Sequence, residues 1–502
     1  MENNFTIKDT VTVFLLPFIF NEEYYHSLEK NTSIWRKIDL VANKNDLGID
    51  KSAFYPHIYK FLVGNLSLKK GEEAVNPNHC IVYSLKENME NQPEEIKYIN
   101  KLFSNTNLEI KVRRNETDRD KLNFRLLNEK SKLSSPKLIL CPNSSVGLLI
   151  LSLALTGDKR TLTDLLAFNN MLHKIDQPPE IQISLPENAH KLRIEEAGKI
   201  YQSLADNVNE NKQSWRLYNL FKFLLSNFDK NTDKGIEPFN TSRFHLFTYF
   251  HVDSSEKFEN GKQPDKNELM TDLIRIAGCQ NKKYKVLPND LYNNEKYRQT
   301  FENIYIASCV EGACMMVDSQ DVDSTFFTGF KNATFLARYL WIYLLVCMQR
   351  HTLIKLTKEL MNIDVKTASS KDGLGKHLKN LSEMKINSFF TDISDHTQHN
   401  DFYRFCSDKL RVKKHIEDVN EKIKDADAIL SYRIEQAETK RNYILQVFMA
   451  VLTITQIFIA LTAYRINIDC WLVMLIPIIC LIIVIGLVLR YFIKRRTERR
   501  KI

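Results

Sequence analysis

The stretch KRNYILQVFMAVLTITQIFIALTAYRINI, from Lys440 to Ile468, is apolar enough to lie in lipid, yet it retains several amide and hydroxyl side chains. A second apolar stretch without charge, from Trp471 to Leu489, follows the short linker RINIDC. Each stretch has about the 20 residues that a helix needs to cross a ~30 Å hydrocarbon core. Backbone groups in lipid must be satisfied within their own segment. The sequence therefore predicts a first transmembrane helix at 442–464, an external loop at 465–470 and a second transmembrane helix at 471–490.

Basic residues flank this pair of stretches on the same side. Lys440 and Arg441 precede the first stretch, and six further basic residues lie in the tail 491–502. By the positive-inside rule, both ends of the chain are predicted to be cytoplasmic, in a multi-pass protein of the bacterial inner membrane. A plain membrane anchor is the simpler alternative, although a single span would be enough for an anchor.

Polar and small residues of the first stretch recur at alternating spacings of four and three. Such spacing places them on one face of a helix. Polar groups inside a membrane usually face a bundle interior or water, so several copies are predicted to assemble with this face inward. The spacing leaves two interpretations open: hydrogen bonds that hold a bundle together, or the wall of a pore. The residues of this polar seam are Asn442, Gln446, Met449, Thr453, Gln456, Ala460, Ala463 and Asn467.

Residues 331–441 are predicted to form a helical stalk region. The segment 332–363 has an apolar centre that is short for a membrane span, and it is predicted to be a buried helix. The following stretch, DKLRVKKHIEDVNEKIKDADAILSYRIEQAETKRN, contains neither Gly nor Pro. Its apolar residues recur at four and three, with charged residues between them, which is typical of a solvated helix with one packing seam. We expect this helix to run unbroken from Ser407 to Tyr464.

The composition indicates a core-forming body for the rest of the chain. Of 502 residues, 26% are charged and 44% are hydrophobic. Strand-like segments such as VTVFLLPFIF, KLILC and RFHLFTYFHV alternate with helix-like ones such as TLTDLLAFNNMLHKI. Residues 1–330 are therefore predicted to form a cytosolic α/β or α+β domain. The net charge of +9 is concentrated in the basic tail, which argues against direct nucleic-acid binding.

The sequence offers little chemistry. It contains no Walker loop, GxGxxG, HExxH or GxSxG, so we expect neither an enzyme nor a bound cofactor, and metal ligands are not identifiable. Nine cysteines without a CxxC pair predict reduced thiols rather than a zinc site or a disulfide framework. Ser144 and Ser145 follow a predicted strand, where backbone amides could hold an anion, although a plain turn is the simpler interpretation. Arg113 and Arg114 could contact phosphate, and a solvated charge run is again the simpler alternative.

The stretch VFMAVLTITQIFIALTA, followed by a short loop, a second span and a basic tail, resembles the C-terminus of the CorA magnesium-channel family. The resemblance implies a cytosolic funnel, a stalk helix, a homopentamer and a pore lined by the seam residues. The family's Gly-Met-Asn signature is absent; AYRIN stands in its place, with Asn467 as the candidate for the signature Asn. Arg465 and Asp469 would then lie at the pore mouth.

The body resembles CorA-like membrane proteins associated with type III CRISPR systems, through SSVGLLILSLAL…LLAFNNMLHKID, FHLFTYFHV and IYIASCVEGACMM. This resemblance implies an antiviral defence effector opened by a nucleotide second messenger, either an S-adenosylmethionine–AMP adduct or a cyclic oligoadenylate. Asn169, Asn170 and His173 would contact the messenger together with the two arginines and two serines named above. We therefore expect a ligand-gated, homo-oligomeric channel whose partners are its own copies, lipids, ions and the messenger. The alternatives are a housekeeping magnesium transporter and a membrane-anchored cytosolic sensor.

Overall fold

In a computed structural model, the chain divides into two compact units. The first unit comprises residues 1–362 and 376–421, and the second comprises 363–375 and 422–502. The residues that the structure describes are 5–29, 33, 35–38, 49–63, 79–85, 109–112, 122–126, 136–156, 160–174, 181–184, 214–215, 221, 224–225, 235–239, 243–254, 265–292, 295–318, 334–362, 382 and 390–464.

One mixed sheet organises the first unit. Its main path runs β12-β13-β14-β11-β1-β7-β5-β4-β8-β9, while β10 pairs with β1 and the chain of pairs β2-β3-β6 joins at β7. The pair β11–β14 is parallel and the other pairs are antiparallel. The strands are β1 Ile7–Phe20, β2 Trp35–Lys37, β3 Ile81–Leu85, β4 Glu109–Val112, β5 Leu122–Leu126, β6 Lys137–Cys141, β7 Val146–Thr156, β8 Ile181–Ser184, β9 Ser214–Trp215, β10 Ile236–Pro238, β11 His245–Val252, β12 Tyr297–Phe301, β13 Ile304–Ser308 and β14 Gly312–Asp318.

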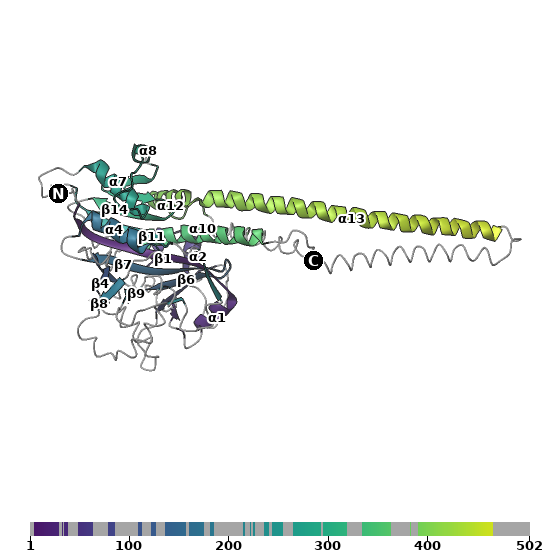
Figure 1. The fold of residues 1–502 in the computed structure, drawn as a ribbon, viewed down its shortest axis with the longest axis horizontal. Helices are drawn as coiled ribbons and strands as arrows, with labels where there is room; N and C mark the ends of the chain where they lie inside the picture. Colours follow the sequence, from purple (N-terminus) through teal and green to yellow (C-terminus); the bar gives the residue numbers. More distant parts are fainter. Residues whose placement is uncertain are drawn as a thin grey trace. The chain divides into compact units, whose positions relative to one another are not determined.

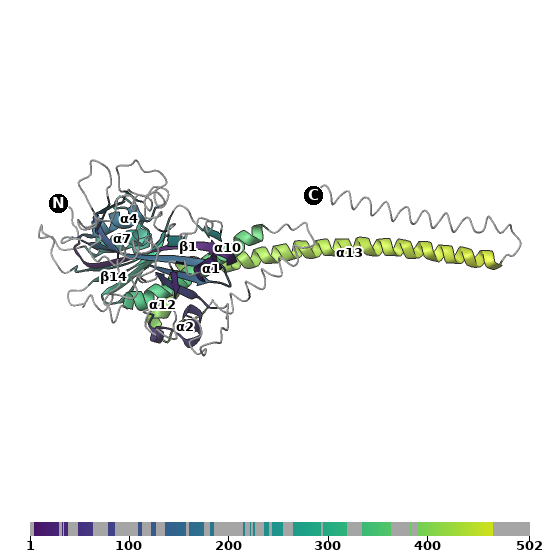
Figure 2. The same cartoon turned by 90° about the horizontal axis from the view of Figure 1, so that it is seen from below.

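Helices cover both faces of the centre of this sheet. Phe14 of β1 meets Phe168 of α4 edge-on, with ring centroids 6.1 Å apart. On the opposite face, Phe247 of β11 stacks on Tyr343 of α10 at 4.9 Å and lies 5.7 Å from Phe402 of α12. Figures 1 and 2 show α4 and α7, which contact each other, over the sheet. The helices are α1 Glu22–Glu29, η1 Lys51–Ala53, α2 Pro56–Val63, α4 Leu162–Leu172, α7 Lys266–Ala277, α8 Pro288–Tyr292, η4 Phe335–Tyr339, α10 Leu340–Met361, α12 Thr397–Lys409 and α13 Val412–Tyr464.

The buried strands follow from their apolar runs. β1 is buried along nearly its whole length, as expected for a strand that is covered on both faces. The predicted strands KLILC and RFHLFTYFHV are confirmed as β6 and β11, and the predicted helix TLTDLLAFNNMLHKI is confirmed as α4. A Cβ atom at Gly312 would lie 2.6 Å from the carbonyl oxygen of Leu246 and 3.0 Å from that of Ala277. Glycine therefore permits the close approach of β14 to β11 and α7.

The long helix differs from its prediction at its start. Within the predicted helix 332–363, residues 335–361 form a buried helix as expected, with a π-helical turn, η4, before α10. The helix that was expected to run unbroken from Ser407 instead ends at Lys409. Arg411 takes the left-handed backbone conformation, with φ 57°, and α13 starts at Val412. α13 then continues for 53 residues, or ~80 Å at 1.5 Å per residue.

The structure corrects the membrane prediction. Among the described helices, none is long and apolar enough to cross a membrane. The first predicted span, 442–464, is the end of the same helix that carries the charged residues of 412–441, and amide and hydroxyl side chains interrupt its apolar run. This finding overturns the predicted two-span CorA-like fold, the inner-membrane location and the ion channel. The predicted loop 465–470, second span 471–490 and tail 491–502 lie outside the described residues.

Candidate functional site

The predicted ligand contacts on α4 belong to a buried polar cluster. Thr161 caps the helix in a reciprocal capping box with Asp164, which fixes where α4 starts. Two turns further on, the side chain of Asn169 is fully buried. Its Oδ1 accepts a hydrogen bond from Thr12 Oγ1 at 3.2 Å, and its Nδ2 donates to Thr248 Oγ1 at 2.9 Å. Asn169 therefore joins α4 to the two central strands of the sheet.

The neighbouring candidates are also engaged within the protein. Asn170 donates from Nδ2 to the carbonyl oxygen of Cys279 at 2.8 Å, which ties α4 to the end of α7. His173 Nδ1 lies 3.1 Å and 2.9 Å from the carbonyl oxygens of Asn169 and Asn170. Burial lowers the pKa of His173 to about 4, so the imidazole is neutral at pH 7. A neutral, buried imidazole does not offer charge to a phosphate.

The two serines lie elsewhere on the sheet. Ser144 and Ser145 form the turn between β6 and β7, where Ser145 has φ 51° and its carbonyl oxygen accepts a hydrogen bond from Phe20 N–H. Asn169 instead contacts Thr12, which is eight residues from Phe20 along β1, or about 26 Å at ~3.3 Å per residue. The structure thus does not bring the serines and α4 into one site. Arg113 and Arg114 lie outside the described residues.

The polar seam of α13 is exposed in the single chain. Asn442, Gln446, Met449, Thr453, Gln456 and Ala460 all lie on α13 with exposed side chains. Thr453 Oγ1 donates to the carbonyl oxygen of Met449 at 2.8 Å, so this hydroxyl is satisfied within its own helix. Ala463 lies in the last turn of α13. Asn467, Arg465 and Asp469 fall outside the described residues.

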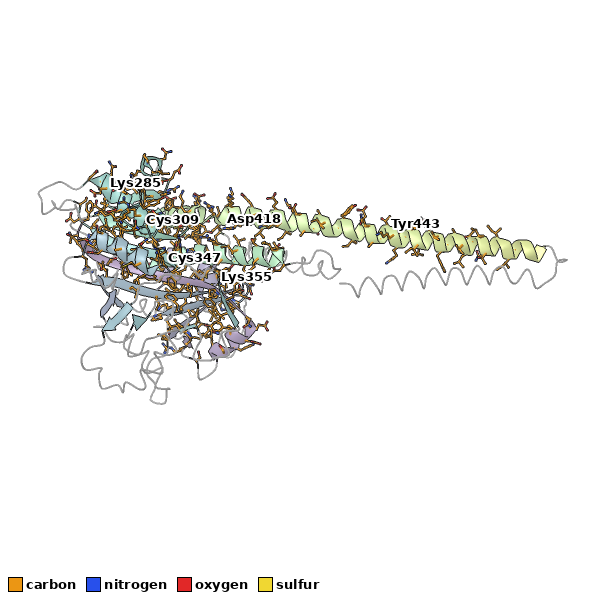
Figure 3. All side chains as sticks on the ribbon, in the orientation of Figure 1. Lys285, Cys309, Cys347, Lys355, Asp418 and Tyr443 are labelled. Atoms are coloured by element: carbon orange, nitrogen blue, oxygen red, sulfur yellow. The ribbon has the colours of Figure 1, made fainter. Side chains whose placement is uncertain are left out.

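α13 also exposes an unusual amount of apolar surface. Of the sixteen large hydrophobic side chains exposed in the described chain, four lie elsewhere and the other twelve lie on α13. Figure 3 shows such side chains along the helix and labels Tyr443 among them. Contiguous apolar surface of this kind marks a contact site in most proteins. The twelve residues are Ile429, Tyr432, Tyr443, Ile444, Leu445, Val447, Phe448, Met449, Leu452, Ile454, Ile457 and Ile459.

The structure brings together three sulfur atoms that the sequence did not predict to be neighbours. Cys80 Sγ lies 2.7 Å from Cys141 Sγ, and Met348 Sδ lies 3.7 Å and 3.3 Å from these two atoms. The two cysteines are 61 residues apart, and Met348 lies 207 residues beyond Cys141. No motif spacing could reveal them, because the pairing of β3 with β6 brings the two cysteines together and the packing of α10 adds Met348. Within the described ranges, His, Cys, Asp and Glu side chains form no group of three or more that could hold a metal ion.

Comparisons with protein-family models and with curated proteins find no match.

Proposed function

We propose that this protein acts as a homo-oligomeric, ligand-responsive effector, in which the sheet-containing unit binds a small nucleotide messenger and α13 carries the response to neighbouring copies. The observation that carries the proposal is the concentration of exposed apolar side chains on one long helix. A helix that is apolar on most sides is normally buried. Residues 443–459 of α13 have this character, and association between copies would bury them.

The polar seam argues for a second copy of this chain as the partner of α13. Seam residues recur at four and three, which is the spacing of a helix face that packs against parallel helices. Each Asn or Gln amide carries both donors and an acceptor. Identical amides at one level of a symmetric bundle can therefore hydrogen-bond to one another. Gln446 and Gln456 supply such amides one and three turns into the apolar stretch.

The start of α13 supports its role in transmission. Val412 and Val419 are buried in the first unit, although the helix is exposed along most of its later length. The helix is continuous from there to Tyr464. A shift of the part of the first unit that buries these two valines would therefore be carried into α13. A ligand produces such a shift only if it binds the two arrangements with different affinity.

The nucleotide class of the ligand follows from the resemblance to CRISPR-associated proteins. The stretches that carry the resemblance form β7, α4, β11, β13 and β14. β13, β14, β11 and β7 follow one another along the sheet, with β1 between the last two, and Asn169 joins α4 to β1 and β11. A shared recognition fold would place its common residues in one such region, which supports the proposal.

Oligomer mass tests the assembly. We expect size-exclusion chromatography with light scattering to give the intact protein a mass that is a multiple of 58.8 kDa. The double variant Gln446→Glu/Gln456→Glu should lower this mass at pH 7, because it places like charges opposite each other inside the bundle. Gln436→Glu makes the same change on α13 but off the seam, and should leave the mass unchanged. A monomeric wild-type protein, or equal masses for both variants, would contradict the proposal.

Thermal unfolding tests the ligand. An S-adenosylmethionine–AMP adduct or a cyclic oligoadenylate, added at 100 times its dissociation constant, should stabilise the folded state by about 2.7 kcal/mol, because it binds that state alone. The same concentration of AMP serves as the control. If neither messenger raises the melting temperature above its value with AMP, the nucleotide is ruled out as the ligand, while the proposed assembly is unaffected.

A further inference from the structure

Three elements bring their sulfur atoms to one point beneath α10. Cys80 directly precedes β3, Cys141 ends β6, and Met348 lies on α10. The antiparallel register pairs Ile81 with Leu140, so that Cys80 and Cys141 face each other across the two strands. The backbone N–H of Cys80 donates to the carbonyl oxygen of Phe61 at 2.8 Å, which anchors this end of β3. The cluster is therefore positioned by backbone pairing rather than by chance contact of mobile side chains.

The cluster is buried and made of soft ligand atoms. Cys80 is 1% exposed, Met348 is 3% exposed and Cys141 is 7% exposed. The two thiol sulfurs lie closer to each other than either of them lies to Met348 Sδ. A buried trio of thiols and thioether suits a soft ion better than a hard one, because soft cations prefer sulfur to oxygen or nitrogen. Zinc, in contrast, takes four ligands in its structural sites and does not favour a thioether.

We propose that Cys80, Cys141 and Met348 form a binding site for one soft monovalent cation of the Cu(I) class. The ion forms bonds to the two thiolate sulfurs and to the thioether. Two S–H bonds break, two protons leave to solvent, and no electron is transferred. Cys141 adjoins the surface turn 142–145, which gives the ion its way in. This site is independent of the function proposed above.

The thiols are protected while the site is empty. Burial, with a contribution from Cys141, raises the pKa of the Cys80 thiol well above its ordinary value. A protonated thiol is a poor nucleophile and a poor target for oxidants. Metal binding must displace its proton, so the affinity for Cu(I) should rise with pH.

Titration of the intact protein with Cu(I) under anaerobic, reducing conditions tests the proposal, with bicinchoninate as the competing chelator. We expect wild type to bind one more Cu(I) ion than Cys80→Ser or Cys141→Ser. Loss of either thiol should lower the affinity of this site at least about 100-fold, because changes to residues that only orient the ligands often lower metal affinity 10–100-fold. Met348→Leu, a volume-conserving change that the core should tolerate, should weaken it about tenfold. Release of two protons per added ion in weak buffer, and sulfur-only ligation by X-ray absorption, should accompany binding.

The control is Cys347→Ser, which makes the same chemical change at a buried thiol next to Met348 in the chain, labelled in Figure 3. It should bind Cu(I) like wild type. Equal Cu(I) stoichiometry in wild type and in the Cys80→Ser and Cys141→Ser variants would overturn the proposal. So would nitrogen or oxygen ligation of the extra ion, or conversion of Cys80 and Cys141 to a disulfide in place of copper binding.

Discussion

Asn169→Asp is expected to destabilise the protein by about 3–5 kcal/mol at pH 7, the range found when a buried charge lacks a partner. The side chain of Asn169 is 0% exposed and lies between two threonine hydroxyls, with no cation among its hydrogen-bond partners. The carboxylate would lose the donor that now reaches Thr248, and it would carry a charge into the core. Urea unfolding followed by circular dichroism measures the difference.

The matched control is Asn267→Asp, which makes the same change in the exposed first turn of α7. A carboxylate at a helix N-terminus is favourable by a few tenths of a kcal/mol, so this variant should be as stable as wild type or slightly more so. A similar, small effect for Asn169→Asp would show that the residue is not part of the structural core. Normal stability combined with loss of messenger binding would return Asn169 to the role of a ligand contact.

The sequence was sufficient where one element decides its own structure. KLILC and RFHLFTYFHV are apolar enough to be strands in any arrangement, and they form β6 and β11. Thr161 and Asp164 have the spacing of a capping box, which a reader could use to place the start of α4. The long helix α13 was likewise visible from the absence of Gly and Pro.

The sequence failed where the answer depends on which elements meet. Nothing local to Asn169 shows that Thr12 and Thr248 will face it, so its amide looked available to a ligand. Likewise, nothing local to Cys80 points to Cys141 or to Met348. The break at Arg411 was missed because its left-handed conformation falls on a residue type that rarely adopts it. The membrane prediction took the charged stretch and the apolar run at 442–464 as one continuous helix, and it gave the apolar run more weight than the amide and hydroxyl side chains that interrupt it.

Acid is expected to unfold the first unit well before its carboxylates are protonated, because four histidines are held neutral by burial. Burial lowers the pKa of His351 to about 3, those of His173 and His399 to about 4, and that of His245 well below its ordinary value. The neighbours of His351 are Arg350, His415 and the ring of His245, which lies 5.0 Å away. None of these three neighbours is a carboxylate that would favour the protonated ring. Arg243 and Lys174 lie near His173, while Arg338 and His396 lie near His399 and lower its pKa. Asp50 is the one carboxylate among these neighbours, and it acts in the opposite direction on His399.

The sign follows from the proton count. Above pH 6.5 neither state binds these protons, and the full stability is present. Between pH 6.5 and about 4 the unfolded chain binds them and the folded chain does not, so stability falls with pH by about 1.4 kcal/mol per unit for each histidine. At pH 5 the four together should remove about 8 kcal/mol, which is comparable to the whole stability of many domains. Hydrogen bonds from Ser52 and the nearby Arg338 hold the pKa of Asp50 below its usual value. The stability that this carboxylate contributes is therefore lost only at lower pH, where the carboxylate is protonated.

Urea unfolding at a series of pH values measures this slope. His351→Asn removes one of the four titrating groups and should reduce the slope between pH 6 and pH 4.5 by about a quarter, whatever it does to stability at pH 7. His26→Asn makes the same change at an exposed position on α1 and should leave the slope as it is in wild type. Equal slopes for both variants would mean that His351 takes up its proton in the folded state. The aromatic and arginine groups around it would then have to reorganise on acidification, which a proton-dependent shift of the Phe239 and His245 ring resonances would reveal.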